Sequence, residues 1–329
     1  MRPFSYQQPA DVAEAVSLLA GSPDGTFLAG GTNLVDLMRL GVSSPDVLVD
    51  VRRLTSDRVE ELPGGGLRIG AAMINSELAA DRRIRQRYPV LSQAVLSSAS
   101  GQLRNMATVG GNLLQRTRCP YFQDLSTPCN KREPGTGCSA QHGYHRDLAV
   151  LGSSQACYAT HPSDMAVAMT ALGAVARSQG PDGQRAIPLT DLYRLPGDCP
   201  DRDTVLGHGE LITSVDLPAL SFGANSRYRK VRDRASYAFA LVSVAAALDV
   251  ADGLVRDVRL ALGGVAHRPW RAIQAEEALR GEPATADRFR YAAAAELADA
   301  RPLSGNAFKV PLAGNLIVSV LLELAGGQP

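Results

Sequence analysis

The 329-residue chain has almost no net charge and no long apolar run. Its 34 Lys and Arg residues against 33 Asp and Glu give a formal net charge of +1, which provides no electrostatic footprint for nucleic acid or an anionic membrane surface. The most apolar segments, residues 238–248 and 316–324, are shorter than the roughly 20 residues that a membrane-spanning helix needs. The first residues lack the charged and then apolar pattern of a secretory signal. We therefore expect a soluble protein that does not direct its own export.

Cysteine is also scarce, since the chain has five, an odd number that does not suggest a disulfide framework. Four of them are clustered, which indicates a metal centre: Cys119, Cys129, Cys138 and Cys157. Three histidines that could replace a thiolate lie nearby: His142, His145 and His161. The cysteine spacing fits neither the paired cysteines of zinc ribbons nor the compact ferredoxin run. From spacing alone, a [4Fe–4S] cluster, a structural zinc ion and buried apolar thiols all stay open.

Hydrophobic periodicity predicts an α/β pattern in the first two thirds of the chain. The first fifty or so residues look like a small βαβ-type unit, with helices expected at 10–20 and 33–40 and strands at 26–29 and 46–51. A second region begins with the strand-like residues 67–70 and continues the pattern to Pro218, with a helix expected at 163–172. Residues 126–141, rich in Pro, Gly and polar side chains, form an irregular insert.

A different pattern begins at residue 226. Residues 227–231, 239–250 and 255–262 are typical of adjacent antiparallel strands, the last two joined by a turn at Asp252 and Gly253. Helices are expected at 272–279, 286–297 and 313–324. We therefore predict an α+β fold, in which an N-terminal α/β region of two subdomains precedes a C-terminal domain of antiparallel sheet plus helices.

Two pairs of adjacent glycines follow β-prone stretches: Gly30 and Gly31 before Thr32, and Gly110 and Gly111 before Asn112. Glycines at such a junction let backbone N–H groups approach and hold a pyrophosphate. The two turns together carry more weight than either alone, because both could line one extended dinucleotide. Two unrelated tight turns would use similar residues, so the pattern alone does not decide.

Two further positions have an ordinary and a functional interpretation. Ser163 and Asp164 open a helix and suit an N-cap, but the Asp164 carboxylate could also bind ribose or ribityl hydroxyls. Lys230 and Arg232 share one face of a strand, where either could stabilise an anionic reduced flavin ring. Without further context, the cap and an exposed amphipathic strand are the favoured interpretations.

Taken in order, these motifs resemble the FAD-binding medium subunit of the xanthine dehydrogenase and carbon monoxide dehydrogenase group of molybdenum hydroxylases. The resemblance covers essentially the whole chain and includes these segments: residues 28–34, 107–112, 162–165, 207–212 and 263–272. The cysteine-rich insert, at about residues 116–158, is most similar to the periplasmic aldehyde oxidoreductase branch, whose flavin subunit carries an additional [4Fe–4S] cluster.

The resemblance implies a domain organisation and a cofactor site. It implies a PCMH-type FAD-binding domain over residues 1–220, with subdomains of about 1–55 and 56–220, and a CO dehydrogenase flavoprotein-like domain over residues 226–329. The FAD contacts that it implies are Leu28, Ala29, Gly30, Gly31, Thr32, Asn33, Leu34, Thr108, Gly110, Gly111, Asn112, Ser163, Asp164, Ile212 and Lys230. The metal ligands that it implies are Cys119, Cys129, Cys138 and Cys157, with Cys199 outside the set.

The function so predicted is that of an FAD- and [4Fe–4S]-carrying electron-transfer subunit of a heterotrimeric molybdenum-containing aldehyde oxidoreductase. The expected partners are a molybdenum-cofactor large subunit and a [2Fe–2S] small subunit, whose electrons would pass through this chain to an external acceptor. The expected compartment is the periplasm, reached as a passenger of a partner-exported complex, with the cytoplasm as the alternative. A zinc-stapled assembly or scaffold subunit and a stand-alone FAD oxidase are the competing functions.

Overall fold

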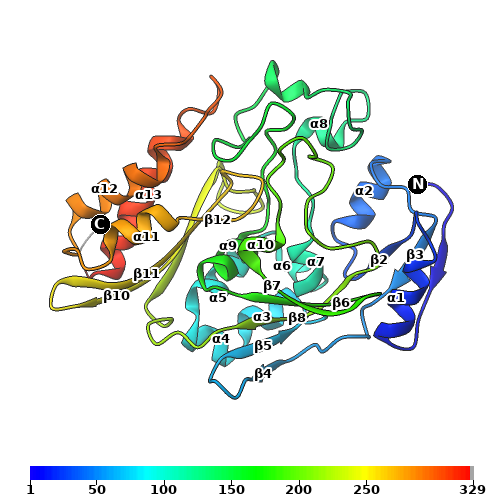
Figure 1. Ribbon diagram of the computed structural model, residues 1–329, viewed down its shortest axis with the longest axis horizontal. Helices are drawn as coiled ribbons and strands as arrows, with labels where there is room; N and C mark the ends of the chain where they lie inside the picture. The colour runs from blue at the N-terminus through cyan, green and yellow to red at the C-terminus, as the bar shows by residue number, and fades with distance from the viewer. Residues whose placement is uncertain (327–329) are drawn as a thin grey trace.

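The computed structural model describes residues 1–326 and begins with a three-stranded parallel sheet (Figure 1). Its strands β1 (Ser5–Gln7), β2 (Thr26–Leu28) and β3 (Val47–Asp50) have the order β1-β3-β2 and are connected by helices α1 (Val12–Ala20) and α2 (Leu34–Leu40). Helix α1 begins after Asp11, whose side chain accepts a hydrogen bond from the N–H of Glu14 at 2.9 Å, as an N-cap does. The predicted βαβ-type unit is confirmed.

The second sheet has the strand order β4-β5-β8-β6-β7 and is antiparallel throughout. Its strands are β4 (Val59–Glu61), β5 (Leu67–Gly70), β6 (Val175–Gly180), β7 (Gly183–Pro188) and β8 (Leu211–Leu217). The sequence predicted the α/β alternation of this region but not its pairing. Strand β8 enters between β5 and β6, so each of its neighbours comes from a distant part of the chain.

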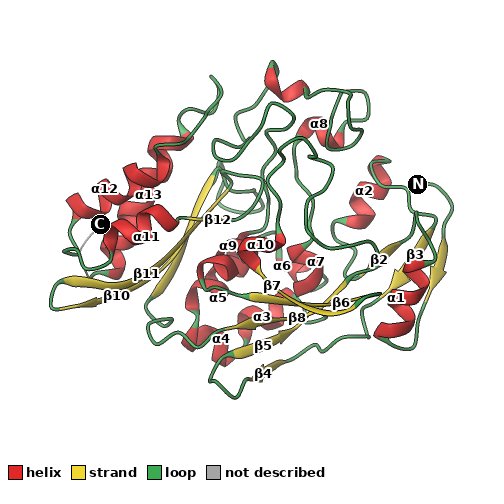
Figure 2. Ribbon diagram, in the orientation of Figure 1, coloured by secondary structure: helices red, strands yellow, loops and turns green. Residues whose placement is uncertain are grey.

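Helices cover this second sheet and enclose the largest hydrophobic core of the described residues. They are α3 (Asn75–Ala80), α4 (Arg82–Arg87), α5 (Pro89–Ser97), α6 (Gly101–Arg104), α7 (Val109–Leu113), α9 (Asp164–Ala171) and α10 (Leu189–Leu192) (Figure 2). Between α7 and α9 runs the cysteine-rich insert, whose regular structure consists of α8 (Pro120–Gln123) and the 3-10 helix η1 (Ser139–Gln141). The predicted irregular insert is confirmed.

The third sheet is antiparallel, with the strand order β12-β11-β10-β9. Its strands are β9 (Ser226–Val231), β10 (Val242–Ala251), β11 (Leu254–Gly263) and β12 (Trp270–Arg271). Helices α11 (Ile273–Leu279), α12 (Ala286–Leu297) and α13 (Lys309–Leu324) cover one face (Figures 1 and 2). Helix α13 begins before the expected residue 313 because Pro311 lies in its first turn, where a missing N–H breaks no intrahelical bond.

Strand β10 separates two hydrophobic cores. Val244, Ala246 and Leu248 pack with the C-terminal helices, whereas Ala245 belongs to the core around the second sheet. This division follows from the period of two along a strand, which points alternate side chains to opposite faces. The third sheet is thereby fixed against the first two thirds of the chain. Among residues 1–326, no helix has both the length and the apolar character needed to cross a membrane.

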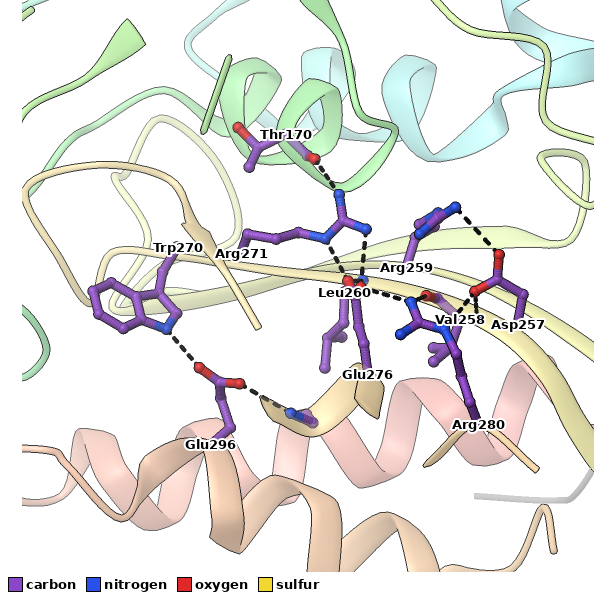
Figure 3. Close-up of polar contacts among 11 residues, drawn as sticks. Thr170, Asp257, Val258, Arg259, Leu260, Trp270, Arg271, Glu276, Arg280 and Glu296 are labelled. Atoms are coloured by element: carbon purple, nitrogen blue, oxygen red, sulfur yellow. Dashed lines mark hydrogen bonds and ion pairs between the residues drawn. The ribbon is translucent and has the colours of Figure 1, made fainter. Parts of the chain in front are cut away.

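A buried polar network joins the third sheet to its helices (Figure 3). Glu276 forms ion pairs with Arg271 and Arg280 and accepts a hydrogen bond from the backbone N–H of Leu260 at 2.7 Å. Arg271 also donates to the carbonyl of Thr170 at 3.0 Å, in α9. The Glu276 side chain is 1% exposed, so its charge depends on these partners for compensation.

We expect Glu276→Ala to lower the free energy of unfolding by about 3 kcal/mol, because the substitution leaves the buried Arg271 guanidinium without its carboxylate. Glu277→Ala is the matched control, since Glu277 is exposed on the same helix, and its effect should stay within about 0.5 kcal/mol. Urea unfolding followed by circular dichroism measures both changes. Equal stability of the two variants would contradict the role assigned to this network.

Candidate cofactor cleft and cysteine cavity

A cleft of about 1310 Å³ lies where the three sheets converge. Its walls come from the β2–α2 connection, the start of α7, the segment leading into β8 and the ends of β9 and β11. The predicted cofactor residues that line it are Ala29, Gly30, Gly31, Thr32, Asn33, Leu34, Thr108, Gly110, Gly111, Asn112, Ser163, Asp164, Ile212 and Lys230. Leu28 is outside this lining because it is the last residue of β2, where its carbonyl accepts the N–H of Val51 at 3.0 Å. The structure thus brings together residues from distant parts of the chain, with Leu28 as the one exception.

The first diglycine turn presents free backbone donors to the cleft. Gly31 has a φ of 73°, a conformation that glycine adopts without strain, and a Cβ on Gly30 would lie 2.0 Å from the carbonyl oxygen of Met106. The N–H groups of Thr32 and Leu34 have no hydrogen-bond partner among the described residues. This loop therefore has the glycines and the unengaged amides that a bound pyrophosphate requires.

The second diglycine turn differs, because its amides are already engaged. The N–H of Gly110 donates to the carbonyl of Ala71 at 3.0 Å, and that of Gly111 donates to Oγ1 of Thr108 at 3.2 Å. Gly110 and Gly111 line the cleft as a wall, and their backbone donors hold the turn itself together. The side chain of Thr108 also caps the short helix α7.

Asp164 and Lys230 form a buried ion pair at the cleft. Nζ of Lys230 lies 2.8 Å from Oδ2 of Asp164, and the two side chains are 3% and 6% exposed. The hydroxyl of Tyr228 donates to the other carboxylate oxygen, and burial raises the pKa of Tyr228 well above its ordinary value of 10. Ser163 accepts a hydrogen bond from the N–H of Ala166 at 2.9 Å, which confirms the predicted N-cap.

Four polar side-chain atoms of residues that line this cleft are buried without a partner. Asn33 Nδ2, Asn75 Oδ1, Arg118 Nε and Ser243 Oγ have no hydrogen bond among the described residues. Buried polar atoms in native proteins are nearly always satisfied, so such atoms indicate a polar ligand or ordered water beside them. The residues present therefore fit a cofactor that combines phosphate with polar and aromatic groups, as FAD does.

A separate small cavity in the insert is lined by all four predicted metal ligands: Cys119, Cys129, Cys138 and Cys157. All four are free thiols, and Cys199 is exposed and lies outside this lining. The backbones of Cys129 and Cys138 form an antiparallel bridge, which brings these two cysteines side by side. Three consecutive parts of the insert thus converge on one all-sulfur donor set, a composition suited to zinc or an iron–sulfur cluster.

Burial favours the protonated form of two thiols in this cysteine cavity, those of Cys119 and Cys157. Burial raises the pKa of Cys119 to about 11 and that of Cys157 to about 12. The nearby backbone N–H groups of Tyr121 and Phe122 oppose this effect at Cys119, and the Ala159 N–H opposes it at Cys157. Metal ligation therefore has to release protons from these thiols, and amides are already in place to stabilise the resulting thiolates.

Within residues 1–326, no three His, Cys, Asp or Glu side chains have the geometry to hold one metal ion. This finding weighs against a zinc staple, in which a single ion binds all of its ligands at about 2.0–2.3 Å. In a [4Fe–4S] cluster each cysteine binds a different iron, so the sulfurs stand farther apart around the cluster.

A polar relay connects the cleft to the cysteine cavity. The N–H of Arg116 donates to Oδ1 of Asn33 at 2.9 Å, and its Nε lies 2.7 Å from Oδ2 of Asp203. Asp203 also pairs with Lys131, a 3% exposed residue that lines the cysteine cavity and donates to the carbonyl of Pro200 at 2.7 Å. Although burial opposes the change, Arg116 and Lys131 lower the pKa of Asp203 to about 2, which keeps the relay charged.

Comparison with known proteins identifies the architecture around the cleft. The family described as "FAD binding domain in molybdopterin dehydrogenase" matches residues 2–220, and the "CO dehydrogenase flavoprotein C-terminal domain" matches residues 226–324. The chain belongs to the molybdopterin dehydrogenase FAD-binding family. The resemblance and the fold class predicted from the sequence are thereby confirmed.

Relatives of this family match the chain over nearly its full length. The aldehyde oxidoreductase FAD-binding subunit PaoB of Escherichia coli is 51% identical, and the match covers 98% of each chain. The carbon monoxide dehydrogenase medium chain of Hydrogenophaga pseudoflava is 26% identical over 97% of this chain and 96% of that protein. The solved CO dehydrogenase from Oligotropha carboxidovorans has the same fold, with a TM-score of 0.77, 24% identity and 99% coverage of each chain.

The family fold also brings residues to the cleft that sequence reasoning missed. Arg118 pairs with Asp36 at 2.7 Å, and its guanidinium carbon lies 5.3 Å from the ring centroid of Phe239. Gly263 and Gly264 line the cleft from the end of β11. The adjacent glycines at 263–264 were a usable signal in the sequence. The ion pair joins residues 82 positions apart and left no local pattern.

We expect Gly30→Ala to weaken FAD binding at least about tenfold, or by ~1.4 kcal/mol, because the added Cβ has to displace the backbone at Met106. Flavin absorbance per chain, measured after gel filtration, reports the loss. Gly101→Ala is the matched control, because a Cβ there meets no atom within 4 Å. A Gly30→Ala protein that keeps wild-type flavin content would contradict the role of this turn, and circular dichroism establishes that the variant is folded.

Proposed function

We propose that this chain is the FAD- and [4Fe–4S]-carrying electron-transfer subunit of a heterotrimeric molybdenum-containing aldehyde oxidoreductase. The observation that carries the proposal is the cleft whose lining contains both a diglycine turn with unengaged amides and the buried Lys230. Support for the aldehyde oxidoreductase branch comes from the 51% identical relative, which is named as the FAD-binding subunit of such an enzyme.

The FAD contacts divide by chemistry. The amides of residues 32–34 are suited to the pyrophosphate, and the unpartnered Asn33 and Asn75 side-chain atoms are suited to its polar groups. Lys230 lines the cleft in an ion pair with Asp164, and it is the proposed neighbour of the flavin ring. When bound, FAD supplies the ability to accept electrons one at a time and release them in pairs.

The cysteine cavity is proposed as the [4Fe–4S] site, with the four lining thiolates as ligands. A zinc staple is the weaker alternative, because the described side chains do not converge on one ion. The polar relay supports a functional association of the two sites, since it holds the insert against the first diglycine turn through Arg116.

The carboxylates of the cleft argue against a stand-alone oxidase. Every one that lines it is ion-paired: Asp36 with Arg118, Asp147 and Asp233 with Arg146, Asp164 with Lys230, and Glu210 with Arg185. Of the lining histidines, His208 contacts the carbonyls of Leu19 and Ser22, and burial lowers the pKa of His161 to about 4. None of these groups is placed as a free base for a substrate, which supports a carrier that acts with catalytic partners.

The remaining parts of the proposal concern organisation. The domains are proposed to divide between residues 220 and 226, with the first domain divided near residue 55, and the family matches at 2–220 and 226–324 agree with the main boundary. The proposed partners are a molybdenum-cofactor large subunit and a [2Fe–2S] small subunit. The proposed location is the periplasm, reached with an exported partner, and fractionation of cells that express the complex tests it.

The iron assignment is tested in the co-expressed complex, isolated anaerobically. Cys138→Ser should remove one ligand and lower the cluster iron, while FAD content stays near the wild-type level because the cleft is separate. Cys199→Ser is the control, since that thiol is exposed outside the cavity, and it should keep all of its iron. Iron analysis and flavin absorbance measure the iron and FAD contents of both variants. Full iron in the Cys138 variant would refute its ligand role, and a colourless, iron-free wild-type complex would refute the proposal.

A further inference from the structure

A histidine from the C-terminal part of the chain reaches the cysteine cavity. His267 lies in the connection between β11 and β12 and is 9% exposed. Its Nε2 lies 3.2 Å from Sγ of Cys157, although the two residues are 110 positions apart. No motif considered for the FAD site or for the cysteine ligands includes this residue.

Backbone hydrogen bonds fix the residues that precede His267, so the fold itself holds the imidazole beside Cys157. The carbonyl of Val265 accepts hydrogen bonds from the N–H groups of Val150 and Leu151 at 2.8 and 3.0 Å. The carbonyl of Ala266 accepts one from the N–H of His161 at 2.9 Å. The two residues that precede His267 are therefore hydrogen-bonded to segments that lie before and after Cys157 in the chain.

The state of the sulfur decides the direction of the His267 hydrogen bond. A free thiol can donate its proton to Nε2, or it can accept one from it. A thiolate bound to iron carries no proton and can only accept, so Nε2 has to carry the hydrogen in the loaded protein. Ligation thus selects the imidazole tautomer in which Nε2–H points at the sulfur.

We propose that His267 is a positioning residue of the iron–sulfur site, which donates Nε2–H to Cys157 Sγ and raises the reduction potential of the cluster. The inference rests on the proposed [4Fe–4S] site. Reduction adds negative charge to the cluster and its sulfurs, and a hydrogen bond to sulfur stabilises that added charge. Lys131 also lines the cavity, but Asp203 compensates its charge, which leaves His267 as the side-chain donor in direct contact with a sulfur.

The location of His267 gives this contact a structural consequence. The third sheet supplies the donor, and the insert supplies the acceptor. The potential of the cluster therefore depends on how the C-terminal domain is seated against the insert, and not only on the ligand set.

Two substitutions at one position test the proposal in the anaerobically isolated complex. His267→Leu removes the donor, whereas His267→Gln keeps an amide N–H at nearly the same distance along the side chain. We expect the Leu variant to retain its iron and to show a lower midpoint potential in a redox titration followed by electron paramagnetic resonance. The Gln variant should lie near the wild-type value. His142→Leu, an exposed histidine of the same insert, is the matched control and should leave the potential unchanged.

The outcomes separate the two proposals. A wild-type complex without cluster iron overturns the proposed cofactor itself. A wild-type complex with full iron and a Leu variant of unchanged potential overturns only the role of His267. If the Leu variant loses iron, the Gln variant decides: wild-type iron and potential support the hydrogen bond, and a loss or shift equal to that of the Leu variant overturns it.

Discussion

The close backbone approach of Gly30 to Met106 is the constraint on which the rest of the site depends. At this point the βαβ unit and the helical layer of the second sheet meet with no room for a side chain, because a Cβ on Gly30 would overlap the Met106 carbonyl. The contact fixes the first turn against the segment that leads into α7. It therefore holds residues 32–34, whose amides have no hydrogen-bond partner among the described residues, in the wall of the cleft.

The second constraint is that charge buried near the two sites is compensated locally. Asp164 and Lys230 neutralise one another at the cleft, and Asp203 balances Arg116 and Lys131 along the relay. A buried ion without such a partner would cost several kcal/mol. These pairs also join segments that are distant in sequence, so the same contacts that offset desolvation position the insert against the FAD turn and β9 against α9.

Much of this arrangement follows from local patterns in the sequence. The βαβ unit, the irregular insert and the β10–β11 hairpin were predicted because alternation, helical periodicity and turn residues act over a few positions. The motif residues at the cleft were found through family resemblance, and Leu28, the last residue of β2, is the one predicted contact that lies outside the cleft lining. The antiparallel pairing of the second sheet and the engaged amides of Gly110 and Gly111 were not predictable, because both depend on partners that the chain brings together only on folding.

The cysteine spacing is a further feature that local sequence patterns could not interpret. The four cysteines lie just before α8, on the two sides of an isolated β-bridge and near the end of the insert, so the distances along the chain are set by the loops between them. A metal site needs closely spaced cysteines only when neighbouring turns of the chain supply its ligands. Here the core around Phe122, Leu148 and Tyr158 brings the segments together, and burial in it raises the pKa of the Cys119 and Cys157 thiols. Apolar burial can therefore organise the cysteine cavity before any metal binds, and the proposed ligation would then not have to fold the insert.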